Sequence, residues 1–116
     1  MVPLPMFTKN LADAKIIKFC DNRIPPHVRN QVRLIHRFRG NSVTIYEERV
    51  PWREDMKEWT SLPIAQIRYN EKTGKWSLYC ADRNSKWHEY YGLEATKNLD
   101  VILNEIDKDP TGIFWG

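Results

Sequence analysis

The chain has 116 residues, of which 41% are hydrophobic and 28% charged, and a formal net charge of +3. A chain of this length sustains one hydrophobic core, so residues 1–116 are expected to form a single domain. Five Trp, five Tyr and four Phe exclude a disordered chain, and the modest net charge excludes the strong basicity of dedicated nucleic-acid binders.

Cysteine use and the first residues indicate the cellular compartment. Cys20 and Cys80 do not make a dense disulfide framework, and "MVPLPMFTKN" lacks a basic region followed by an apolar core. We therefore expect a cytoplasmic protein with both thiols reduced. No apolar run approaches the roughly 18 residues that a membrane-spanning helix needs, so no membrane association is expected.

A first helix is predicted from about Leu11 to about Asn22. Its apolar residues approximate helical spacing, and Thr8 or Asn10 is the candidate N-cap. The apolar residues of this stripe are Leu11, Ala14, Ile17, Phe19 and Cys20. Pro25 and Pro26 end the helix, because the residue before a proline is disfavoured in the α region.

The next segment alternates as a strand does. Leu34, His36 and Phe38 are separated by arginines, and Gly40-Asn41 suits a two-residue hairpin turn. This turn pairs Phe38 with Val43, His36 with Ile45 and Leu34 with Glu47, and it places Arg37 opposite Thr44 and Arg33 opposite Glu48. One face of the hairpin is therefore predicted to be core, and the other to carry arginines.

Three further strands complete the predicted sheet. A polar loop is expected from Arg49 to Pro63, followed by a second hairpin around "NEKTG" and a fifth strand in "KWHEYY". In this last strand Trp87, Glu89 and Tyr91 are expected on one face, with His88 and Tyr90 on the other.

A second helix is predicted after Asn98. It has four apolar residues at helical spacing, namely Leu99, Ile102, Leu103 and Ile106, and Pro110 ends it. The predicted fold is α+β, with an N-terminal helix, an antiparallel five-strand meander and a C-terminal helix packed on one sheet face.

Several motifs together resemble those of a family of small bacterial proteins described as domain of unknown function 3024. They are "RIPPHVRNQVRL", "RGNSVTIYEERVPW", "EWTSLPIAQIRY", "WSLYCADRNSKWH" and "DPTGIFWG", and the resemblance runs from about Phe19 to Gly116. It implies a free-standing bacterial protein of this length, but it brings no activity and no assigned residues.

The segment from Arg23 to Tyr46 contains five arginines and no carboxylate. Arginine suits phosphate, and exposed aromatic rings such as Tyr79 and Tyr90 would stack unpaired bases. The candidate nucleic-acid-binding residues are Arg23, Arg29, Arg33, Arg37, Arg39 and Tyr46. The simpler alternative is a solvated face on which Arg33 pairs with Glu48.

A protein-interaction module, acting as a regulator or inhibitor, is the competing functional hypothesis. Aromatic residues are enriched at interface hot spots, and the candidates here are Trp52, Trp59, Phe114 and Trp115. The simpler expectation for the tail is that Ile113, Phe114 and Trp115 dock against the sheet.

The sequence gives little support to an enzyme. His36 falls on the predicted core face, His27 follows two prolines, and His88 stands in a segment without a catalytic motif. No metal-ligand spacing, phosphate-binding glycine loop or nucleophile motif is present. No catalytic residue, metal or cofactor is assigned, and the expected partner is single-stranded nucleic acid or a protein.

Overall fold

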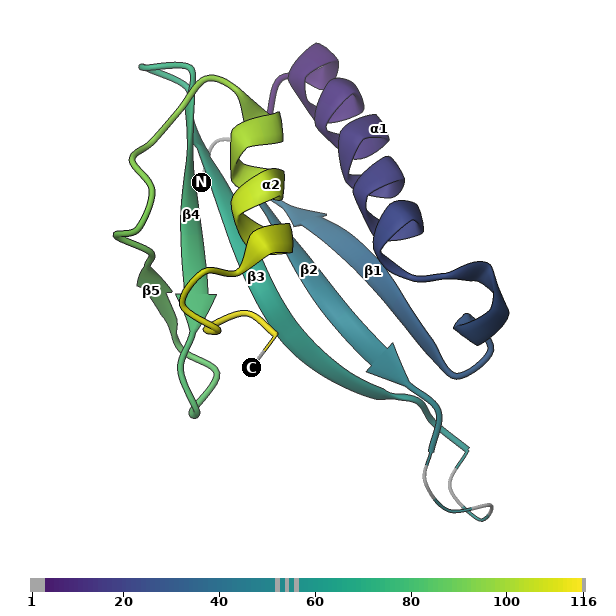
Figure 1. Cartoon of the computed structure of the whole chain (residues 1–116). Coiled ribbons are helices and arrows are strands. Elements are labelled where there is room, and N and C mark those ends of the chain that lie inside the picture. The colour runs from purple at the N-terminus through teal and green to yellow at the C-terminus, as the bar shows by residue number, and fades with distance from the viewer. Residues whose placement is uncertain (1–3, 52, 54, 56, 116) are drawn as a thin grey trace.

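The structure is a computed structural model that describes residues 4–51, 53, 55 and 57–115. The chain forms two α-helices, one 3-10 helix and five strands (Figure 1). In chain order these are α1 Met6–Arg23, η1 Pro26–Val28, β1 Val32–Arg39, β2 Ser42–Arg49, β3 Thr60–Asn70, β4 Lys75–Ala81, β5 Trp87–Glu89 and α2 Leu99–Lys108.

The sheet is an antiparallel meander of order β1-β2-β3-β4-β5. Figure 1 shows α1 and α2 side by side over one face of this sheet. Two ion pairs join the helices: Lys15 to Asp100 at 2.7 Å and Arg23 to Asp107 at 2.8 Å. The predicted α+β fold, with a helix before and a helix after a five-strand meander, is confirmed.

The first hairpin has the predicted register. Phe38 pairs with Val43, and Arg37 pairs with Thr44. Gly40 in the turn adopts a φ of 58°, a left-handed conformation that glycine accepts without a steric penalty. The alternation of the sequence therefore predicted which side chains of β1 face the helices and which face away.

The predicted loop from Arg49 to Pro63 is too long. Strand β3 begins at Thr60, and its first residues pair with the end of β2 beyond a bulge between Ile45 and Tyr46. Pro63 lies opposite Tyr46 next to this bulge, where a residue without an N–H is tolerated in a strand. A proline in a strand interior is normally evidence against a strand, which is why the sequence misled.

Helix α1 differs from its prediction in start and in orientation. It begins at Met6, Pro5 occupies the N-cap position, and no side chain caps it. Its buried residues are Ala12, Ile16 and Cys20, so the predicted stripe is wrong in part: Leu11, Ala14 and Ile17 are exposed. Spacing of four residues aligns the buried positions along one ridge of the helix.

Helix α2 matches its prediction closely. The Asn98 side chain accepts a hydrogen bond from the Asp100 N–H, as expected of an N-cap. All four predicted apolar residues of α2 are buried. They join a core that includes Val43 and Ile45 of the predicted hairpin face together with Ile67 and Leu78, whereas Leu34 and Phe38 are only partly buried because β1 is an edge strand.

The segment after β4 is the least well predicted part of the sheet. Strand β5 covers only Trp87–Glu89, and Tyr90 is buried instead of exposed. The Tyr90 hydroxyl donates to Glu105 Oε2 at 2.7 Å, and this hydrogen bond, together with burial, raises the pKa of Tyr90. Tyr90 is therefore part of the core beneath α2 and cannot stack a base.

Candidate functional site

One face of the sheet is left uncovered by the helices, and we call it the open face. Side chains alternate along a strand, so the register assigns every second residue to this face. Its residues are Arg33, Ile35, Arg37 and Arg39 of β1, Ser42, Thr44, Tyr46 and Glu48 of β2, Ser61, Pro63, Gln66, Arg68 and Asn70 of β3, Lys75, Ser77, Tyr79 and Ala81 of β4, and Trp87 and Glu89 of β5.

Two rows of the open face cross the sheet at right angles to the strands. In the first row Arg37 is followed by Thr44, Gln66 and Tyr79, and in the second Arg39 is followed by Ser42, Arg68 and Ser77. The residues on β2 are small while their neighbours are long. A shallow hollow of about 320 Å³ results, lined by Arg37, Phe38, Arg39, Ser42, Thr44, Tyr46, Gln66 and Trp87.

Guanidinium groups on the open face lie against aromatic rings. The Arg68 guanidinium lies 3.8 Å from the Tyr79 ring centroid, and the Arg37 guanidinium 5.8 Å from that of Tyr46. Arg68 Nε also donates to Gln66 Oε1 at 2.7 Å, and Gln66 Nε2 donates to Thr44 Oγ1 at 3.0 Å. These bonds orient Arg68, and its terminal N–H groups have no acceptor in the described part of the chain.

The positive charge of the open face is concentrated at its β1 end. Arg37 and Arg39 are exposed, and neither has a carboxylate partner among the residues that the structure describes. Arg33 is different, because its Nε lies 2.8 Å from Glu48 Oε1 and its guanidinium lies 4.1 Å from the Trp59 ring centroid. The ion pair that the solvated-face alternative predicts is therefore present between Arg33 and Glu48, while Arg37 and Arg39 are exposed to solvent.

Two predicted candidates lie away from the open face. Arg23 donates to the Asp107 carboxylate and lies 4.0 Å from the Trp115 ring centroid, on the helix side. Arg29 donates to the backbone carbonyls of Ile24 and Asp21 at 3.1 and 2.8 Å. Both arginines therefore hold structural contacts, and only Arg33, Arg37, Arg39 and Tyr46 of the six candidates share the open face.

The three described aromatic candidates for a protein interface, Trp59, Phe114 and Trp115, are not presented together. Trp52 lies outside the described residues, and Trp59 is half-buried beside Arg33. Phe114 is only 5% exposed, and Trp115 donates its indole N–H to the Ile106 carbonyl at 2.7 Å. The tail is therefore docked through Phe114 and Trp115, while Ile113 remains exposed.

Two of the three histidines make structural contacts. His36 Nε2 lies 2.6 Å from Asp13 Oδ1 and joins β1 to α1, and His88 Nε2 lies 2.7 Å from Asp82 Oδ2. The hydrogen bond from His88 is the main cause that lowers the pKa of Asp82. His27 is exposed after the two prolines. Among the described residues, potential metal ligands do not gather in groups of three or more.

Both thiols are free and buried. Burial, with a smaller contribution from the charge of Asp21, raises the pKa of Cys20 to about 11. Burial also raises the pKa of Cys80, which lies on the helix side of β4. A raised pKa disfavours the reactive thiolate, so neither cysteine has the environment of a nucleophile.

Sequence reasoning did not name Gln66, Arg68 or Trp87 of the open face as candidates. The alternation of β3 already separates Gln66 and Arg68 from the core residues Ala65 and Ile67. What the sequence lacked was the partner strand, because the contact between Arg68 and Tyr79 depends on the β3–β4 register.

Comparison with known families gives a match over nearly the whole chain. The model of a family described as Domain of unknown function (DUF3024) matches residues 4–116. Neither the curated proteins nor the solved structures include a match. Among the described residues, no helix combines the length and apolar character needed to cross a membrane.

Proposed function

The chain belongs to the family described as Domain of unknown function (DUF3024), and we propose that it is a small binding module for single-stranded nucleic acid. The open face is the proposed binding surface. The observation that supports this most strongly is the combination, on one uncovered sheet face, of the unpaired Arg37 and Arg39 with the arginine-aromatic pair of Arg68 and Tyr79.

The arginines would hold the sugar-phosphate backbone. Guanidinium groups are planar and bind phosphate through two parallel hydrogen bonds. Arg37 and Arg39 lie two residues apart on the edge strand, and Arg39 shares a row with Arg68. The phosphates would therefore follow β1, with Arg68 as a third contact nearer the middle of the sheet.

The aromatic residues would stack bases. Tyr46 on β2 and Tyr79 on β4 are on strands about 10 Å apart at the usual spacing of neighbouring strands, and Tyr46 lies one row further along the sheet. Tyr46 and Trp87 line the same hollow. With its backbone along β1, a single strand would direct its bases inward over these rings, as aromatic platforms do in single-strand binding.

A single strand suits this surface better than a duplex. The bases of a duplex are stacked on each other and present only their edges, so a ring on a flat sheet cannot stack on them. The open face also lacks a helix that would enter a groove (Figure 1). Unpaired bases can instead lie flat against Tyr79.

The direct test is to map the binding surface by NMR. Titration of the protein with an oligonucleotide of about 12 nucleotides should shift the backbone amides of β1, β2 and β3 around Arg37, Thr44 and Arg68. Amides of α2, on the opposite side of the sheet, should stay in place. Shifts confined to the helices would contradict the proposed surface.

A protein-interaction module remains the alternative proposal. Its best support is at the base of the β2–β3 extension, where Val50 and Leu62 are exposed near the half-buried Trp59. The docking of Phe114 and Trp115 leaves this alternative with fewer exposed aromatic residues than the sequence suggested.

A further inference from the structure

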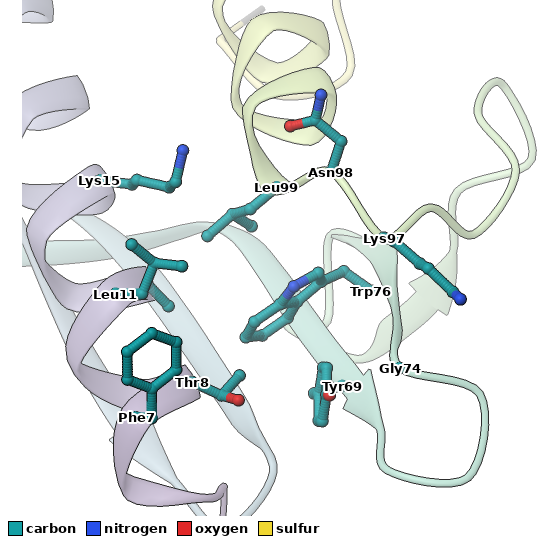
Figure 2. Close-up of a pocket in the computed structure, with 11 residues that line it drawn as sticks. Phe7, Thr8, Leu11, Lys15, Tyr69, Gly74, Trp76, Lys97, Asn98 and Leu99 are labelled. Carbon is teal, nitrogen blue, oxygen red and sulfur yellow. The ribbon is translucent and has the colours of Figure 1, made fainter.

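A second hollow lies on the helix side of the sheet, away from the open face. It has a volume of about 430 Å³ and is enclosed by the start of α1, the β3–β4 hairpin and the start of α2 (Figure 2). A volume of this order is typical of pockets that hold small organic molecules. The lining is contributed by segments far apart in the chain, which the fold brings together.

The walls of this hollow are aromatic and apolar. Tyr69 and Trp76 form one wall, with ring centroids 4.7 Å apart and an angle of 55° between the rings. Figure 2 shows Phe7 and Leu11 of α1 facing this wall across the hollow. Phe7 is 81% exposed and Leu11 51% exposed, so two large apolar side chains one helical turn apart have little cover.

Two polar groups of the lining are donors without a hydrogen-bond acceptor in the described part of the chain. Trp76 is 5% exposed, yet its indole N–H has no acceptor among the described residues, although a buried indole N–H normally has one. No described side-chain polar atom is both fully enclosed and unsatisfied, so this N–H keeps some exposure to solvent, and Trp76 is one of the residues that line the hollow. The Tyr69 hydroxyl likewise makes no hydrogen bond within the described part of the chain.

The charge of the lining has a single sign. Lys15 and Lys97 both line the hollow, and the lining contains no Asp or Glu. Lys15 lies 2.7 Å from Asp100, whereas Lys97 has no carboxylate partner in the described residues. Lys97 carries the unpaired ammonium of the lining, and its exposed side chain extends outward from the rim of the hollow (Figure 2), which favours a ligand with one negative charge at that rim.

We propose that this hollow binds a small aromatic carboxylate. The aromatic body would lie between the Trp76 and Tyr69 rings on one side and Leu11 and Phe7 on the other. The carboxylate would accept from the Trp76 N–H and lie near Lys97. A singly charged carboxylate fits one free ammonium among apolar walls better than a phosphate, whose second charge would lose its hydration without a partner. This site is independent of the open face.

Naphthoate is a suitable probe, because it carries a flat aromatic body and one carboxylate. Calorimetry should give saturable binding of one naphthoate per chain, and the Trp76 indole N–H resonance, assigned with Trp76→Phe, should shift in parallel. The neutral naphthyl methanol should bind the native protein about five-fold more weakly than naphthoate does. The Lys97→Gln variant should bind naphthoate about five-fold more weakly than the native protein does. Lys86→Gln, an equal loss of charge in the β4–β5 loop, should leave the affinity for naphthoate unchanged.

Two variants at Leu11, Leu11→Glu and Leu11→Gln, separate the effect of side-chain charge on ligand binding from the effect of side-chain shape. Leu11 is half exposed, so both substitutions should leave the circular dichroism spectrum unchanged. Leu11→Glu should weaken naphthoate binding at least about five-fold relative to Leu11→Gln, because it places a like charge at the rim. Equal affinities in the two variants, or no saturable shift of the Trp76 resonance, would overturn the proposal. A Trp76 shift that follows protein concentration alone would also overturn it and assign the hollow to a second copy of the chain.

Discussion

The Arg68 guanidinium lies 3.8 Å from the Tyr79 ring centroid, and the two residues come from neighbouring strands of the open face. The hydrogen bond from Arg68 to Gln66 holds the guanidinium in this position before any ligand is present. A positioned side chain loses less conformational entropy on binding than a free one. The middle of the open face is therefore organised in advance for contact with a phosphate beside a base.

Removing the two unpaired arginines should weaken nucleic-acid binding without unfolding the protein. Arg37→Ala/Arg39→Ala deletes two exposed side chains that pair with no described carboxylate, so the free energy of unfolding should change by less than about 1 kcal/mol. The slope of log K against log salt should flatten by about 1.4 on a single strand, at about 0.7 for each phosphate that is no longer neutralised. Anisotropy of a labelled oligonucleotide measures the slope, and urea denaturation measures stability.

A matched control removes the same charge elsewhere. Lys18 on α1 and Lys72 in the β3–β4 turn are exposed, and no ion pair joins either to another described residue. Lys18→Ala/Lys72→Ala should bind nearly as the native protein does. Equal losses in the two double variants would show that net charge, and not the open face, governs binding.

Loss of base stacking at Tyr79 should lower the affinity for nucleic acid without the change in salt dependence that loss of an arginine causes. Tyr79→Ala should cost about 1 to 3 kcal/mol of binding free energy, with a smaller effect on the salt slope than the arginine variant. Tyr91 is the matched control, because it is 88% exposed beyond the end of β5. If Tyr91→Ala weakened binding as much as Tyr79→Ala, the stacking role assigned to Tyr79 would be wrong.

The sequence predicted the parts of the fold that depend on local pattern. The β1–β2 register followed from the alternation around Gly40, and the α2 core stripe followed from helical spacing after Asn98. The orientation of α1 was harder, because Leu11 and Ile17 are as apolar as the buried Ile16 and only the packing against the sheet decides between them.

The candidate site was predicted less completely than the fold. Because the arginines are close together in the sequence, Arg23 and Arg29 were assigned to the same site as Arg37 and Arg39. In the structure Arg23 binds Asp107 and Arg29 binds backbone carbonyls, both away from the open face. Proximity in sequence is a poor guide across a helix end and a turn. Arg68 was missed for the converse reason, since its neighbours in space come from another strand.

The docked tail should depend on Asp109. Its carboxylate accepts from the N–H groups of Phe114 and Trp115 at 3.1 and 2.8 Å, and its backbone is left-handed with a φ of 43°. Asp109→Ala should therefore lower the free energy of unfolding by about 2 kcal/mol in urea denaturation. Asp107→Ala, which removes an exposed ion pair with Arg23, should cost less than about 1 kcal/mol. An equal loss in both variants would refute a special role for Asp109.

The Cys20 thiol should be protected in the native protein. Because its pKa is raised to about 11 from 9.0, the thiolate fraction at pH 8 should fall about a hundred-fold relative to the unfolded chain. The folded state holds the proton more tightly, so this group also lowers stability as pH rises from 9 towards 11. Alkylation at pH 8, followed by mass spectrometry of the Cys20 peptide, should be slow in buffer and fast in urea. Similar rates in both would contradict the burial of this thiol.

The most direct test of the open face is the salt dependence of single-strand binding by the native protein. Fluorescence anisotropy with a labelled oligonucleotide of about 12 nucleotides should show binding at low salt, because the face presents arginines and stacking rings together. Contacts from Arg37, Arg39 and Arg68 predict a slope of log K against log salt of about −2. An absence of binding at low salt, or binding whose slope is unchanged in Arg37→Ala/Arg39→Ala, would contradict the account.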